Sequence, residues 1–138
     1  MKRNTLFFIS LLLLIFLLFI SLSQAASYII QNPSDKQLRL IKIALGEGIT
    51  IKSSAMIKSS NHKNAFYIGV NFYAPGVKEK MTGIWLIGGT WSNPGMLFSV
   101  DGYAHQFSGM RKASETKAAA YPHDPESKYI LQFLKSKK

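Results

Sequence analysis

Residues that could bind a metal ion are few and widely spaced in this chain. The three histidines, His62, His105 and His123, show none of the short spacings that place two imidazoles on one metal ion. The chain has no cysteine, which excludes a disulfide scaffold, a thiolate zinc site and a cysteine nucleophile. We therefore predict no metal and no cofactor.

The hydroxyl groups form no nucleophile elbow. No serine stands in a G-x-S-x-G sequence. A hydrolase triad could still be assembled in space from His105, Asp101 and a serine. A small enzyme with its site between the sheet and the C-terminal segment would use His105, Asp101 and Tyr103. This set supports one alternative for the function, a small extracytoplasmic enzyme.

Tyrosine, tryptophan and asparagine side chains suggest a binding surface. Tyr67, Asn71 and Tyr73 share one face of their predicted strand, because alternate residues of a strand point to the same side. If Trp85 and Trp91 fall on that face too, a polar-aromatic platform results, suited to stacking carbohydrate or docking a protein. The alternative is that the C-terminal helix covers this face, because its own apolar stripe must be buried somewhere.

The net charge of the chain is strongly positive. There are 17 Lys and Arg residues against 7 Asp and Glu, which gives a formal charge of +10. Such a balance favours an anionic partner: lipid headgroups, wall polymers, lipopolysaccharide or an acidic protein. Lys52 and Lys58 alternate onto one face of a predicted strand and indicate part of a basic surface. Most other lysines are dispersed, which is also typical of residues that only keep a small domain soluble.

The N-terminus has the order of a secretory signal peptide. Lys2 and Arg3 precede an apolar run over 6–22, and Ser23 and Ala25 supply small residues for a cut after Ala25. The alternative is an uncleaved anchor helix, since the run approaches the length of a membrane span. Both predict the same topology, with the rest of the chain outside the cytoplasm. Contact with a membrane is expected only through this run, if it is retained.

The remainder of the chain, 26–138, is the length of one domain. The sequon at Asn32-Pro33-Ser34 is blocked by its proline, which fits a bacterial source. We expect a periplasmic, secreted or outward-facing anchored protein. This location argues against nucleic acid as the partner, although the charge would suit it.

The first element of the domain is predicted as a helix over 34–45. Ser34 and Gln37 form a capping box, an apolar face follows, and Gly46 to Gly48 supply the stop. A strand over 38–45 is the alternative, because the apolar residues are dense and partly β-branched.

Four strands follow in the predicted order. Alternating apolar residues indicate strands over 49–58 and 66–73, and apolar runs bounded by turns indicate strands over 83–91 and 96–100. Gly88 and Gly89 inside the third strand predict a bulge or a close approach of backbone.

The C-terminal third is predicted to be helical in part. Asp101 can cap a short helix over 102–108, and Asp124 with Pro125 can start another. The basic, alanine-rich stretch 110–121 fits either a short helix or a loop. A helix, four strands joined by short connections and then helices predict an α+β fold: an N-terminal helix packed on an antiparallel four-stranded sheet, with short C-terminal helices.

Part of this pattern resembles a known family. Over about 38–110 the chain has the order Phe66-Tyr67-Ile68, Pro75-Gly76, Trp85, Leu97-Phe98-Ser99-Val100, Ala104 and Phe107-Ser108. This order is similar to the "YFV…PG…W…IxSV…A…FS" order of a family of small uncharacterised exported bacterial proteins. The resemblance implies a fold and an extracytoplasmic location, and no activity.

The sequence therefore favours an exported, non-enzymatic binding module of the bacterial cell envelope. Its binding surface is predicted from the basic and aromatic sheet residues above. The small enzyme and a membrane-anchored accessory protein are the alternatives.

Overall fold

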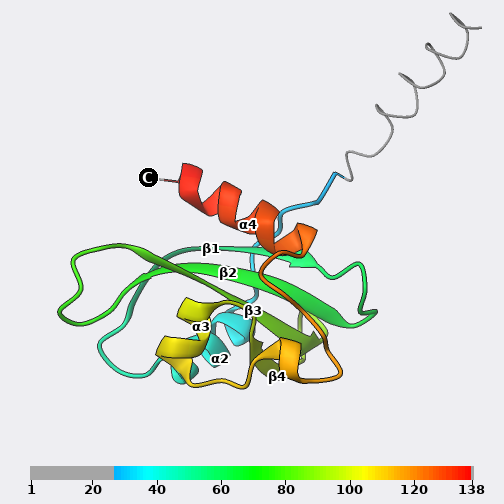
Figure 1. Cartoon of the computed structure of the whole chain (residues 1–138), viewed down its shortest axis with the longest axis horizontal. Coiled ribbons are helices and arrows are strands. Elements are labelled where there is room, and N and C mark those ends of the chain that lie inside the picture. The colour runs from blue at the N-terminus through cyan, green and yellow to red at the C-terminus, as the bar shows by residue number, and fades with distance from the viewer. Residues whose placement is uncertain (1–26, 138) are drawn as a thin grey trace, which may run out of the picture.

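The computed structural model describes residues 27–137, which form a sheet with helices on both faces (Figure 1). The predicted signal peptide or anchor, residues 1–25, lies outside the described residues. In chain order the elements are α2 (Asp35–Leu45), β1 (Thr50–Lys58), β2 (Ala65–Tyr73), β3 (Met81–Gly89), β4 (Pro94–Ser99), α3 (Gly102–Ser108), the 3-10 helix η1 (Ala113–Glu115) and α4 (Pro125–Ser136).

The sheet is an antiparallel meander in the order β1-β2-β3-β4. Each strand pairs with its neighbour in the sequence, because short connections can join only antiparallel strands. The predicted α+β class is confirmed, with an N-terminal helix, a four-stranded antiparallel sheet and short C-terminal helices. The register between β3 and β4 shifts between Ile87 and Gly89, which confirms the bulge predicted from the glycine pair.

The first element is the helix α2, and the strand alternative is wrong. The Gln37 N–H donates to Ser34 Oγ at 3.3 Å, and the Ser34 N–H donates to Gln37 Oε1 at 2.9 Å. These two bonds satisfy donors that a helix start leaves unpaired. Gly46 ends the helix with a positive φ of 82°, and Ile41 and Leu45 are buried beneath it.

The side of the sheet that carries α2 and α3 is called the α2 face. The Phe72 ring lies at its centre, with ring centroids 6.3 Å from Trp85 and 5.4 Å from Phe107. The buried residues of this core come from both helices, from the first three strands and from the position just after β2: Ile41, Leu45, Met56, Ile68, Val70, Phe72, Ala74, Met81, Trp85, Ile87 and Ala104.

The opposite side, called the α4 face, is covered by α4 and the segment that leads to it. Gly69 of β2 lets this helix approach, because a β-carbon there would meet the side chains of Ile130 and Leu134. The buried residues of this second core are Ala55, Ile57, Ala65, Tyr67, Ile84, Leu86, Val100, Ala113, Ala120, Ile130 and Leu134. The C-terminal helix therefore covers the strand face that carries Tyr67, which was the alternative to an exposed aromatic platform.

A bulge in β1 changes which residues share a face. The pairing with β2 shifts between Ile51 and Ser53, so the side chain of Ile51 joins the α2-face core while that of Ala55 joins the α4-face core. Our expectation that Lys52 and Lys58 share one face is therefore wrong. Lys58 lies on the α2 side of the sheet edge, and Lys52 lies on the α4 side.

The lead-in before α2 is bound to the sheet, which the sequence did not predict. Gln31 and Met56 exchange two backbone hydrogen bonds, each 2.9 Å long, at the outer edge of β1. Tyr28 packs against the α4-face core, and its ring centroid lies 5.5 Å from that of Tyr129. The chain thus passes from the α4 face, around the edge of β1, to α2 on the other face (Figure 1).

Residues 110–121, for which the sequence allowed either a short helix or a loop, form η1 and turns. The Ser99 N–H donates to the Arg111 carbonyl at 3.0 Å, so this segment pairs with the outer edge of β4. The residues that form the two cores lie between Tyr28 and Leu134.

Candidate functional site

The aromatic residues predicted as a platform do not form one. Tyr67 is fully buried on the α4 face, where its hydroxyl donates to Asp124 Oδ2 at 2.7 Å. Trp85 is fully buried on the α2 face, and its indole N–H donates to Ser108 Oγ at 3.2 Å. Trp91 stands in the turn after β3 and is 54% exposed. Tyr67 and Trp85 lie on opposite faces of the sheet, and each is covered, so the expected shared surface is corrected.

Asn71 is the polar centre beneath the C-terminal half of α4. It is buried, and its amide donates to Ser53 Oγ at 2.9 Å and to the Leu134 carbonyl at 3.2 Å. Its carbonyl accepts from Thr82 Oγ1 at 2.6 Å. All of these contacts are internal, so Asn71 fixes the helix to three strands and does not face a ligand.

Two residues of the predicted set do meet in a cleft at the C-terminal end of α4. This lysine cleft has a volume of about 340 Å³, and its lining residues come from β1, β2, the loop before β3 and the end of α4. They are Lys52, Ser53, Tyr73, Lys80 and Lys137.

Several contacts hold the lysines at this cleft. The Lys80 ammonium donates to the Lys137 carbonyl at 3.0 Å, which joins the loop to the end of α4. Lys52 Nζ lies 5.9 Å from the centre of the Tyr73 ring, and Lys137 Nζ lies 4.6 Å from that of Phe133. Lysines at the last turn of a helix also suit the negative end of its dipole.

The chemistry of the lysine cleft is that of an anion receptor. Its lining side chains contain three ammonium groups and two hydroxyl groups, and none is a carboxylate. Among residues 27–137 the structure shows one ion pair between side chains, Lys112 with Glu115, and it lies elsewhere. An anionic group in the cleft would therefore meet donors on several sides.

The residues of the enzyme alternative have structural partners. Asp101 Oδ1 accepts from the Ala104 N–H at 2.8 Å and caps α3, and burial raises the pKa of this carboxyl. His105 Nδ1 lies 2.9 Å from the Met110 carbonyl, so it must carry its proton there and donate. Tyr103 is 52% exposed on α3. The three residues do not form a pair of nucleophile and base.

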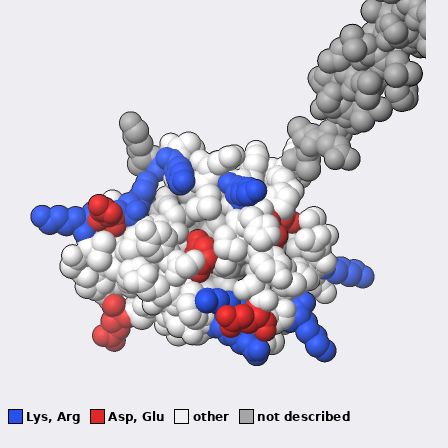
Figure 2. All heavy atoms as spheres, in the orientation of Figure 1, with Lys and Arg blue, Asp and Glu red and all other residues white. Residues whose placement is uncertain are grey.

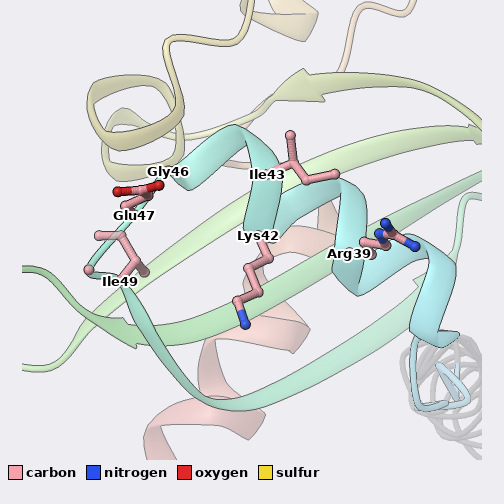
Figure 3. A pocket seen from close by; sticks show the side chains of 7 residues that line it. Arg39, Lys42, Ile43, Gly46, Glu47 and Ile49 are labelled. Carbon is pink, nitrogen blue, oxygen red and sulfur yellow. The ribbon is translucent and has the colours of Figure 1, made fainter.

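A second hollow lies at the C-terminal end of α2 (Figure 3). Its volume is about 510 Å³, and the side chains of Arg39, Lys42 and Glu47 stand around it. Figure 3 shows these three side chains pointing in different directions. Charges of both signs and divergent side chains make this hollow a poorer receptor than the lysine cleft.

No metal centre or membrane span is found in the part of the chain that the structure describes. Residues 27–137 bring no three His, Asp or Glu side chains together as a metal site would require. The helices of this region are too short or too polar to cross a membrane.

Sequence reasoning missed Ser53, Lys80 and Lys137 as parts of one site. In the sequence, Lys80 is part of a charged stretch typical of a solvated loop, and Lys137 follows a predicted helix whose dipole favours a positive charge there. Only the bulge at Lys52 and the point where α4 ends bring them together.

No protein-family model, curated protein or solved structure matches this chain, so its function is inferred from its own clefts and surfaces.

Proposed function

We propose that this chain is an exported, non-enzymatic binding module of the bacterial cell envelope, and that its lysine cleft holds an anionic group of an envelope component. The observation that carries the proposal is the lining of the cleft, which offers ammonium and hydroxyl donors and no carboxylate. The secretory pattern of the first 25 residues supports the envelope location.

The surfaces first predicted for binding support this proposal in part. Lys52 and Tyr73 line the cleft, while Tyr67, Asn71 and Trp85 are buried inside the fold. The proposed site is therefore smaller than the platform inferred from alternation, and charge rather than aromatic stacking dominates it.

The test is binding of inorganic polyphosphate, a soluble polyanion, measured by isothermal titration calorimetry. We expect Lys52→Gln with Lys80→Gln to weaken binding roughly tenfold, which corresponds to about 1.4 kcal/mol. Affinity should also fall steeply as salt is added, because exposed charges are screened.

The matched control is Arg39→Gln with Lys42→Gln, which removes the same charge from α2 on the other face. It should leave most of the affinity. Equal losses in both double variants would show that only the net charge matters and would overturn the cleft as the site. Equal binding of a neutral dextran would overturn the anionic ligand.

A further inference from the structure

The exposed side of α4 carries charge of one sign. Its exposed positions include Lys128, Gln132 and Lys135, spaced along one side of the helix, with Tyr129 beside them. The one acidic residue of α4, Glu126, is fully buried, where its Oε1 accepts from Ser60. The outer side of this helix therefore offers only positive charge.

The other helical side of the molecule differs. The exposed residues of α2 include Asp35 as well as Lys36, Arg39 and Lys42, and Glu47 follows shortly after the helix, so charges of both signs stand on this side. Figure 2 shows basic side chains along the upper side of the molecule, over the region that α4 occupies in Figure 1.

The lysine cleft lies at the C-terminal end of this helix, where Lys52, Lys80 and Lys137 add three ammonium groups. The twelve residues of α4 span about 18 Å at 1.5 Å per residue. Lys128 and Lys135 are exposed along this length.

Tyrosines stand at the other end of this surface. Tyr129 is 41% exposed and packs on Tyr28, the second residue that the structure describes. Tyrosine suits the boundary between water and acyl chains, because its ring is apolar and its hydroxyl is polar.

The chain also leaves the domain at this end. The apolar run ends at Leu22, and five residue steps separate it from Ser27. A fully extended chain covers at most about 3.6 Å per residue, or about 18 Å here. Wherever the run is retained in a bilayer, the side of the domain that carries Tyr28 and α4 is therefore held within that distance of the lipid.

We infer that the exposed side of α4, defined by Lys128, Tyr129, Gln132 and Lys135 together with the lysine cleft, docks on an anionic lipid bilayer. This inference rests on the proposed function and names the anionic component as lipid headgroups. Lysines attract the headgroup charge, and Tyr129 reaches the interface. The α2 face then points away from the membrane.

The experiment uses the species that begins at Ala26, which contains both cores, and the full chain beside it. Sedimentation is measured with vesicles of phosphatidylglycerol and phosphatidylcholine, and with vesicles of phosphatidylcholine alone. We expect Lys128→Gln with Lys135→Gln to lower the partition onto anionic vesicles roughly 25-fold, about fivefold for each lysine. The control Arg39→Gln with Lys42→Gln should retain most binding.

Aromatic and labelled variants test the orientation. Tyr129→Ser should weaken vesicle binding, while Tyr103→Ser, an exposed tyrosine on α3, should not. The absence of cysteine allows a single environment-sensitive label at Gln132→Cys or at Gln106→Cys. Anionic vesicles should shift the emission of the first label to the blue and leave the second, on α3, unchanged.

The outcomes separate this inference from the proposed function. Binding to polyphosphate without binding to anionic vesicles would overturn membrane docking and leave the anionic cleft in place. Failure with both probes would overturn both. A blue shift of the label at Gln106→Cys would overturn the assignment of this face. Equal losses of vesicle binding in the Lys128/Lys135 and Arg39/Lys42 double variants would overturn it too.

Discussion

At the scale of single residues, Tyr67 shows how a candidate binding residue becomes a structural one. Its hydroxyl donates to Asp124 Oδ2, which also accepts from the Tyr121 N–H at 2.7 Å. This arrangement fixes the approach to α4 against the middle of β2. Burial raises the pKa of Tyr67 above its ordinary value, and the bonded Asp124 and nearby Glu126 raise it further.

We expect Tyr67→Phe to lower the free energy of unfolding by about 1–2 kcal/mol, because Asp124 loses a donor in a partly buried place. Urea denaturation measures this change. Tyr103→Phe is the control, since that side chain is exposed, and its effect should stay within about 0.5 kcal/mol. Equal effects would contradict a structural role for the Tyr67 hydroxyl.

The pH dependence of stability should carry the same signature. The pKa of Tyr67 is higher in the folded chain than its ordinary value of 10.0, so the folded state holds this proton more tightly. Its contribution is complete below about pH 10 and is lost as the pH rises further. The unfolding free energy should therefore fall more steeply above about pH 10 in the wild type than in Tyr67→Phe. Parallel curves would refute this.

Asp101 gives a second prediction at this scale. Asp101→Ala removes the cap of α3 and should cost about 1 kcal/mol of stability. Asp101→Asn keeps an acceptor and should cost less at pH 7, because burial raises the pKa of the carboxyl and so disfavours its charge. Thermal unfolding of both variants decides this. A loss with Asn as large as with Ala would mean that the charge itself is required.

At the scale of elements, the contact of α4 with β2 depends on one missing side chain. We expect Gly69→Ala to cost about 1–3 kcal/mol, because its methyl group meets Ile130 and Leu134. The double variant with Ile130→Ala should lose less than the sum of the single losses, since the smaller residue makes room. Chemical denaturation of all three variants gives the coupling, and strict additivity would argue against this collision.

Most helices and strands could be predicted from the sequence, because the signals that mark them, such as caps and alternation, involve residues only a few positions apart. The capping box at Ser34 and Gln37 set the start of α2, and alternation set the strands. The faces of β1 were mispredicted because one extra residue at Lys52 reverses the alternation, and no residue type there marks a bulge. Of the residues that line the lysine cleft, only Lys52 and Tyr73 were predicted. The cleft joins four segments whose meeting depends on tertiary packing.

At the scale of the whole molecule, cell fractionation tests location and attachment together. Under the proposed export and docking, we expect a species that begins at Ala26 to sediment with membranes at low salt and to be released by high salt. Intact mass spectrometry of each fraction measures this. A full-length species that resists the salt wash would instead identify residues 6–22 as an anchor. A full-length species confined to the cytoplasm would refute export.

The lead-in also has a consequence for the timing of maturation. A cut after Ala25 would leave only Ala26 and Ser27 before Tyr28 packs on Tyr129, and Gln31 is paired to the edge of β1 soon after. A peptidase needs a stretch of accessible, extended chain around the bond that it cleaves. Removal of a signal peptide would thus compete with closure of this first strand pairing, and slow processing would leave a folded domain whose cleavage site is harder to reach.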